Sequence, residues 1–505
     1  MNNGNVKNNW TIMVYISADD VLANFAIDSL NQLRQAATED GDKVIALFDP
    51  NDGKKQTFLY SFDGTNKTKP LSDVAQPHGE LNMANPDTLS DFVKLASEPL
   101  SEPKDRHYCL ILWGHGTELL LDRDPGTTGE RYLTPAKLKT ALENTKFNKE
   151  NKLDFIAFDA CSMSMVEVAT ALQGCAQYMI ASQDEVPDVS FPYARIVEGL
   201  RGHGEDPKKV AELIPQIYVE SFRDYLVTDR NGVKEIMLSS LDLENIEQIT
   251  RPVSNLADLL LRAVADEDLS NAIIDARKIS RDFVLGLFVD IYDFCEKLPA
   301  SLNENKCENK KYYGELKTAC EQVRKEIANT ENVIANVTRP NVEGCHGVSI
   351  YFPYSFQENE KAQLQRLLGE AETGVVNLTL VKGGPGDARK ARNGRIEELE
   401  KDFRHLPFFE SEGWGTFIKH GWSLALARKF PNKLDLHYSA EQVARNLSAV
   451  VGGGVAAGLG SGPGAGGPSG PSGGGGGPSE EIRRLRKENE DLTKELERLA
   501  LKPGA

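Results

Sequence analysis

The sequence has no uninterrupted apolar run approaching the roughly 20 residues that cross a lipid bilayer. Its opening residues, MNNGNVKNNW, lack the apolar core of a signal peptide. Basic side chains are in the minority: 58 Lys and Arg stand against 75 Asp and Glu, a formal net charge of −17. This balance disfavours binding to nucleic acid or to an anionic membrane. We therefore expect a cytoplasmic protein, or a secreted one if the N-terminus is trimmed.

Cysteine is also scarce, with seven residues scattered over a chain of 505. An odd and dispersed set does not form a disulfide framework. Neither C-x-x-C nor H-E-x-x-H spacing occurs, and no Gly-rich phosphate loop with its lysine is present. From the sequence we expect no organic cofactor and no zinc or other metal ion held by such a motif.

Short apolar runs, most of them separated by helical patterns, dominate the first half of the chain. They lie at residues 10–16, 44–48, 109–113, 155–158 and 178–181. Runs of this length and composition are typical of buried parallel strands. Their alternation with helices predicts an α/β fold with a mainly parallel central sheet and helices on both faces. A later run at residues 347–353 is expected to return a strand to this sheet.

Composition predicts several parts of unequal size. We expect one large α/β domain over residues 1–425, with a helical subdomain at about 244–330 and a basic surface insertion at about 383–404. A helical segment is expected at 426–450. Residues 451–479 are almost entirely Gly, Pro, Ala and Ser, which predicts a flexible linker that cannot bury a core.

Residues 480–501 follow a heptad pattern. Its two seam positions are apolar except for one asparagine: Ile482, Leu485, Asn489, Leu492, Leu496 and Leu499. This pattern is typical of a parallel two-stranded coiled coil, although about three heptads alone make a marginal helix. We expect self-association or a partner helix here; a solvated charged helix is the alternative. Linker and coiled coil together look like an appended module, native or engineered.

Two of the predicted strands end in reactive side chains. The strand at 109–113 is followed by His115 between two glycines, and the strand at 155–158 leads to Cys161. Ligands of open α/β sheets bind at the carboxyl ends of strands. A histidine there can activate a neighbouring thiol, and a helix expected to begin near Ser164 would favour the thiolate. On chemistry alone, a turn histidine and a buried cysteine explain these residues equally well.

The runs Trp113-Gly114-His115-Gly116 and Asp159-Ala160-Cys161-Ser162-Met163-Ser164 resemble the two signature strands of the clostripain-like cysteine peptidases, family C11 of clan CD. Further runs at 15–20, 79–83 and 347–353 are similar to that family and occur in order. The resemblance covers residues 10 to about 425. It implies the caspase-like α/β sandwich that this clan shares with gingipains and legumain.

The resemblance also implies an endopeptidase in which His115 is the base and Cys161 the nucleophile of an acyl-enzyme. Gly116 is the candidate donor to the oxyanion. Family members are commonly zymogens that are cleaved after a basic residue between the two strands. We expect this cleavage after Arg131, with Lys146 among the alternatives and an ordinary loop charge as the other interpretation. Some relatives need calcium; no EF-hand spacing occurs here, so that requirement stays open.

For substrate choice, the family places an aspartate two residues before the nucleophile, at the floor of the primary specificity pocket. Here that residue is Asp159, and a buried carboxylate would select Arg or Lys. A turn or capping role is the alternative. A second pocket acid is expected in the loop after Ala181, where Asp184, Glu185 and Asp188 are the candidates. The loop departs from the Gly- and aromatic-rich version of the family.

Three settings fit these residues. The first is an intracellular regulatory or defence protease of a bacterium, controlled by dimerisation or a partner helix. The second is a secreted digestive or virulence-type protease that lacks its signal in this chain. The third is a catalytically inactive scaffold that acts through its coiled coil; the intact His115 and Cys161 argue against it.

Overall fold

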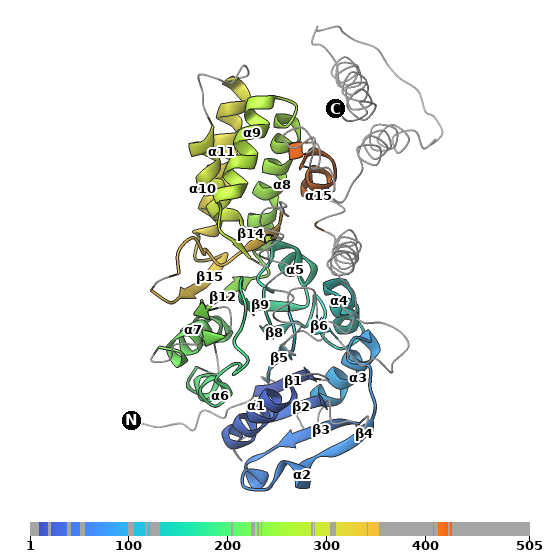
Figure 1. Ribbon diagram of the computed structural model, residues 1–505. Helices are drawn as coiled ribbons and strands as arrows, with labels where there is room; N and C mark the ends of the chain where they lie inside the picture. The colour runs from blue at the N-terminus through green and yellow to red at the C-terminus, as the bar shows by residue number, and fades with distance from the viewer. Residues whose placement is uncertain are drawn as a thin grey trace, which may run out of the picture.

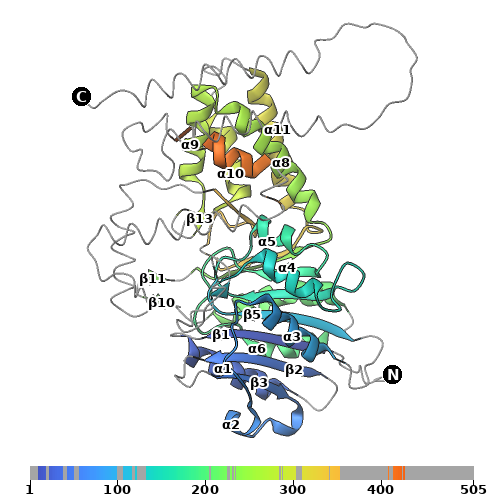
Figure 2. The same cartoon turned by 90° about the vertical axis from the view of Figure 1, so that its right-hand side faces the viewer.

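The computed structural model describes residues 10–18, 22–37, 42–50, 56–98, 106–116, 120–121, 132–203, 206–223, 228–229, 232–233, 235–283, 286, 288–302, 310–340, 342–352, 408, 413–422 and 425–426. Within these ranges, a large twisted sheet with helices on both sides forms one part of the molecule (Figure 1). A bundle of helices rises from the end of the sheet where β12 and β15 lie, as a second view also shows (Figure 2).

Over the residues that the structure describes, the main sheet has nine strands. In spatial order they are β15 (Val333–Thr338), β12 (Met237–Asp242), β9 (Ala176–Ala181), β8 (Leu153–Asp159), β5 (His107–Trp113), β1 (Trp10–Ala18), β2 (Lys43–Pro50), β3 (Thr57–Phe62) and β4 (Gln76–Gly79). The strands from β9 through β8, β5 and β1 to β2 run parallel. Antiparallel strands extend both ends. The predicted α/β fold with a mainly parallel central sheet is confirmed.

Both faces of the central strands are buried, which explains their continuous apolar sequences. In β1 every residue is buried. Met13 and Tyr15 enter the hydrophobic core on one face of the sheet, whereas Ile12 and Val14 enter the core on the other. Because successive side chains of a strand point to opposite faces, a strand covered on both sides needs apolar residues at every position.

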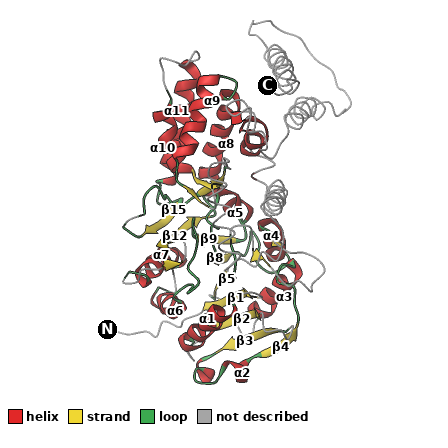
Figure 3. Ribbon diagram, viewed as in Figure 1, coloured by secondary structure: helices red, strands yellow, loops and turns green. Residues whose placement is uncertain are grey.

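Helices cover the two faces in separate layers (Figure 3). One layer consists of α1 (Ala23–Ala36), α6 (Tyr193–Gly202) and α7 (Pro207–Ser221). The other consists of α3 (Pro86–Ser97), α4 (Pro135–Glu143) and α5 (Val166–Ala171). The short α2 (Leu71–Val74) lies beyond β3, near the edge formed by β4. This layering leaves the carboxyl ends of the parallel strands to the loops.

The helical bundle is formed by α8 (Ile246–Ala263), α9 (Glu267–Ile279), α10 (Ile291–Ser301) and α11 (Lys310–Ile327). Helix α11 packs against α8 and α10, and α10 packs against α9. A later segment, α15 (Gly413–Thr416) with η2 (Phe417–Trp422), packs on α8. Its aromatic rings surround Phe352. This segment therefore belongs to the same folded body.

The strand expected at 347–353 does not return to the main sheet, so that prediction was wrong. It forms β16 (Ser349–Tyr351), which pairs with β14 (Phe288–Asp290) in a three-stranded sheet completed by β13 (Asp282–Phe283). An apolar run reveals that a segment is buried but not which strands flank it. The edge of the main sheet is instead β15, whose partly exposed residues gave no such signal.

Several predictions fall outside the described residues: the insertion at 383–404, nearly all of the segment at 426–450, the linker at 451–479, the coiled coil at 480–501 and Arg131. Short strands β6 (Leu120–Leu121) and β7 (Tyr132–Leu133) pair between β5 and α4, and β10 (Thr228–Asp229) pairs with β11 (Gly232–Val233). None of the helices described here is long and apolar enough to cross a membrane.

Candidate active site

The strands that precede His115 and Cys161 are neighbours in the sheet. Strands β5 and β8 pair in parallel, and their last residues, Trp113 and Asp159, are register partners. The pairing continues one step further, because the Gly114 amide donates to the Asp159 carbonyl at 3.3 Å. Gly114 has φ 151°, a conformation that favours glycine. Both reactive residues thus leave the sheet at the same edge.

Gly116 brings the two segments into direct contact. A Cβ atom added at this position would lie 1.9 Å from the Cys161 carbonyl oxygen and 2.3 Å from its amide nitrogen. Real Cβ atoms do not approach that closely, so only glycine lets the chain after His115 lie on the backbone of Cys161. The structure therefore brings together the predicted base, the predicted nucleophile and the predicted oxyanion donor.

The thiol of Cys161 differs from the other thiols in its exposure. Among the cysteines that the structure describes, all are buried except Cys161, which is half-buried. Burial raises the pKa of the Cys109 thiol, and it raises that of Cys175 to about 11. Buried thiols of this kind are inert, whereas an accessible one can react. Exposure therefore singles out Cys161.

The segment between β9 and α6, residues 182–192, passes over the nucleophile; we call it the β9–α6 loop. Its Val186 amide donates to the Cys161 sulfur at 3.3 Å, and the Asp184 carbonyl accepts from the Ser162 amide at 3.0 Å. Ser162 has φ 53°, which is sparsely populated for a residue with a side chain and is typical of functional sites. The loop thus fixes the turn that presents Cys161.

The helix expected to begin near Ser164 begins at Val166 and has six residues. The amides of Ser162 and Ser164 donate to the carbonyls of Asp184 and Ser182. They are therefore unavailable to a thiolate or an oxyanion. The amide that does contact the sulfur belongs to Val186, which no sequence signal identified.

Asp159 lies directly beneath this turn, and its carboxyl group is buried. Its Oδ2 accepts hydrogen bonds from the Phe191 amide at 3.1 Å and the Tyr193 hydroxyl at 2.8 Å. Among the described residues, Oδ1 has no hydrogen-bond partner. Burial raises the pKa of Asp159 to about 7, against the lowering effect of the Phe191 amide and of the Tyr193 and Ser190 hydroxyls. One carboxylate oxygen is thus held and the other remains to receive a donor.

The other acids of the β9–α6 loop have different surroundings. Asp184 is half-buried, and its Oδ2 lies 3.5 Å from the Arg281 guanidinium, which also pairs with Glu235. Asp188 is exposed in the same loop. The charge of Asp184 is therefore already partly compensated within the protein, unlike a carboxylate reserved for a ligand.

Ser190 joins the loop to the strand that leads to His115. Its Oγ accepts a hydrogen bond from the Trp113 indole at 2.6 Å, and its backbone has φ 66°. The loop thereby contacts the ends of both β5 and β8. No pattern in the sequence predicted this role, because a serine in a polar loop has no distinguishing signal. No group of three His, Cys, Asp or Glu side chains that could hold a metal ion occurs in the described ranges.

An accessible thiol at the carboxyl edge of a mainly parallel sheet is an arrangement that a cysteine hydrolase of the α/β class could use. The model of the clostripain family, peptidase C11, matches residues 14–420, and the chain belongs to this family of cysteine peptidases. Clostripain of Hathewaya histolytica is 24% identical over 415 residues, covering 70% of this chain and 76% of clostripain. The family resemblance is thus confirmed over most of the chain.

Two solved structures are similar at low identity. A secreted C11 cysteine protease from Bacteroides thetaiotaomicron, in complex with an irreversible peptide inhibitor, is 17% identical with a TM-score of 0.47, covering 73% of this chain and 99% of its own. An inactive zymogen C11 protease from Parabacteroides distasonis is 18% identical with a TM-score of 0.46, covering 72% and 96%.

Proposed function

We propose that this peptidase cleaves after Arg or Lys, with Cys161 as nucleophile and His115 as base. The observation that carries the proposal is the contact of Gly116 with the Cys161 backbone, which places the segment of His115 beside the only described thiol that is not buried. A base and a nucleophile held on adjacent strands need little reorganisation before reaction.

In this mechanism the His115 imidazole takes the proton of the Cys161 thiol. The thiolate attacks the scissile carbonyl carbon, and backbone amides, with that of Gly116 as the candidate, bind the negative oxygen. The carbon–nitrogen bond then breaks as His115 returns the proton to the leaving amine. Water, deprotonated by the same imidazole, hydrolyses the acyl-enzyme and restores the thiol.

Asp159 is proposed as the floor of the specificity pocket. The free Oδ1 of its buried carboxyl group supports this role, because a guanidinium or ammonium group is the donor that best compensates a buried carboxylate. Such a cation would also favour the ionised form of Asp159. Asp188 remains a second candidate, whereas Asp184 would have to exchange Arg281 for the substrate.

Activation by cleavage after Arg131 is part of the proposal. The next residue, Tyr132, begins β7, so the cut would free the start of that strand. The alternative Lys146 is less suitable, since its Nζ donates to the Ser97 carbonyl and the Tyr108 hydroxyl, both at 2.8 Å. An intact mass that stays unchanged after incubation of active enzyme would contradict this step.

The partner and the cellular location also stay predictions. Self-association through the heptad seam at 480–501 predicts a dimer that disappears when the chain is ended at residue 450. Sedimentation of the two chains tests it. An intracellular regulatory protease and a secreted one both fit the proposed chemistry.

A substrate-library profile tests the central proposal. Wild-type enzyme should cleave after Arg or Lys, and this cleavage should vanish in Cys161→Ala and in His115→Ala. Cys109→Ala is the matched control, because that thiol is buried in β5. Cleavage that persists in Cys161→Ala overturns the dyad. Cleavage after Asp or a neutral residue overturns the role of Asp159.

A further inference from the structure

The β9–α6 loop is held by a buried amide side chain next to its first residue. Gln183 is 1% exposed. Its Nε2 donates to Asp290 Oδ2 at 2.9 Å, and its Oε1 accepts from the Gly347 amide at 2.8 Å. A buried amide with partners at both ends is fixed in position, because each lost hydrogen bond would leave a desolvated polar group.

Asp290, the first partner of Gln183, is itself rigidly held. It is completely buried and caps helix α10, where its Oδ1 accepts from the Asp293 amide at 2.8 Å. The His346 amide donates to Oδ2 at 2.6 Å, and the His346 ring lies 3.1 Å from Oδ1. Tyr292 stacks on that ring at 3.9 Å. Asp290 therefore anchors Gln183 to the base of the helical bundle.

Gly347, the second partner, is anchored to the main sheet. Its carbonyl accepts from the Ser164 hydroxyl at 2.6 Å and from the Ser239 hydroxyl at 2.9 Å. Ser164 lies three positions after the nucleophile, and Ser239 belongs to β12. Gln183 is consequently hydrogen-bonded to the helical bundle on one side and, through Gly347, to Ser164 and β12 on the other.

We propose that Gln183 is a positioning residue that sets the Val186 amide against the Cys161 sulfur. The inference rests on the proposed function in taking Cys161 as the nucleophile. Only two residues separate Gln183 from Val186. A displacement of Gln183 would therefore also displace the backbone amide of Val186. That amide donates to the sulfur, and a donor stabilises the thiolate more than the neutral thiol.

The test compares Gln183→Met with Asn332→Leu in the full-length chain. Both substitutions keep the approximate shape of a buried amide and remove its hydrogen bonds; Asn332 is 2% exposed and donates to the Glu326 carbonyl at 2.9 Å. The Asn332 backbone carbonyl accepts from the Asp242 amide. Asp242 is at the end of β12 that pairs with the middle of β9, not with its carboxyl end. Asn332 is therefore remote from Cys161.

The first readout is the rate of Cys161 alkylation by iodoacetamide across pH, followed on the Cys161 peptide by mass spectrometry. In Gln183→Met the thiol should titrate at higher pH, with alkylation at pH 6 slowed roughly tenfold. His115, Asp159, Asp184 and Tyr218 are unchanged in both variants, so the difference reports the contacts of Val186 with the sulfur. In these contacts the amide donates at 3.3 Å and the carbonyl accepts from the thiol at 3.9 Å. The kcat for a peptide substrate should fall roughly 10- to 100-fold.

Asn332→Leu and Gln183→Met should alter the unfolding midpoint by similar amounts. Asn332→Leu should nevertheless leave the alkylation profile of Cys161 and the kcat at wild-type values. If the thiol profile of Gln183→Met matches wild type, or if the control loses activity equally, the positioning role is wrong. Should Gln183→Met not unfold cooperatively, Gln183→Asn applies the same test, because it keeps a neutral amide but is one methylene too short to hold both Asp290 and Gly347. Peptidase activity that survives in Cys161→Ala would refute the proposed function. The two failures can be told apart, because the alkylation rate is measured without any peptide substrate.

Discussion

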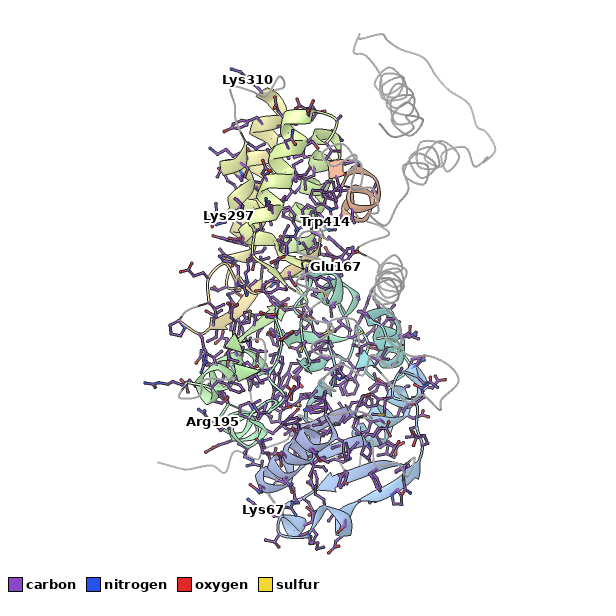
Figure 4. The ribbon with its side chains drawn as sticks, in the orientation of Figure 1. Lys67, Glu167, Arg195, Lys297, Lys310 and Trp414 are labelled. Atoms are coloured by element: carbon purple, nitrogen blue, oxygen red, sulfur yellow. The ribbon has the colours of Figure 1, made fainter. Side chains whose placement is uncertain are left out.

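Asp159 is the last residue of β8, at the carboxyl edge of the main sheet. Glu167 lies at the junction between the sheet and the helical bundle (Figure 4). Both carboxyl groups are buried, and burial raises the pKa of each to about 7. Each has one oxygen without a hydrogen-bond partner among the described residues. By these electrostatic criteria alone, the two regions are indistinguishable.

Their surroundings separate them. The partners of Asp159 belong to the β9–α6 loop and the start of α6, next to the accessible thiol. Glu167 accepts from the Tyr351 amide at 2.9 Å, and the Tyr351 carbonyl in turn accepts from the Trp414 indole. The junction joins α5, β16 and the later α15 segment. A perturbed pKa therefore identifies a functional group only when the site around it can receive a ligand.

Asp159 and Glu167 should differ most in their effect on catalytic activity. Asp159→Asn removes the proposed partner of a basic substrate side chain, so kcat/KM for Arg substrates should fall roughly 30- to 1000-fold. Glu167→Gln should change it less than about twofold, since that side chain only joins two structural elements. Steady-state kinetics on one Arg peptide measures both. Equal losses in the two variants would contradict the comparison.

Stability should instead show the two residues to be alike. A carboxyl group whose pKa is raised in the folded protein stabilises fully below its unfolded pKa, and this contribution is lost as pH rises towards 7. For Glu167, with an ordinary value of 4.5, Glu167→Gln should therefore stabilise the protein by up to about 3 kcal/mol at pH 8 and by little at pH 4. Asp159→Asn should behave similarly. Urea unfolding across this range measures it; a gain that is independent of pH would exclude burial of charge as the cause.

The Tyr193 hydroxyl donates to Asp159, so its removal should affect activity through that carboxyl group. Tyr193→Phe removes one hydrogen bond that lowers the pKa of Asp159, so the acidic limb of kcat/KM should move to higher pH. Activity on Arg substrates at pH 6.5 should drop roughly three- to tenfold. Tyr218→Phe is the control: that hydroxyl is buried and, within the described part of the chain, makes no hydrogen bond. A loss in the control equal to that in Tyr193→Phe would count against the assignment.

The smallest effect is expected at the junction. Trp414→Phe keeps an aromatic ring beside Phe352 and removes the indole hydrogen bond of 2.9 Å to Tyr351. The free energy of unfolding should fall by about 1 kcal/mol. Peptidase activity should be unchanged when measured well below the unfolding midpoint. A selective loss of activity would show that the junction communicates with the site.

Those parts of the fold and the site that depend on neighbouring residues could be predicted from the sequence. Continuous apolar runs gave the central strands, and the residues after two of those runs gave His115 and Cys161. The contacts that hold the site are of another kind. Gln183 and Asp290 are 107 positions apart, and Gln183 and Gly347 are 164 apart. No periodicity links such residues, and a polar side chain in a loop looks the same whether it is solvated or buried.

If the chain is cut in the segment that connects β5 to β8, these two paired strands belong to different polypeptides. His115 would then lie on one polypeptide and Cys161 on another. Backbone hydrogen bonds between the two strands, and the continuous core on both faces of the sheet, would hold these polypeptides together without a peptide bond. Cleavage would release no fragment: the enzyme would migrate as one particle in native solution and separate into two pieces only on denaturation.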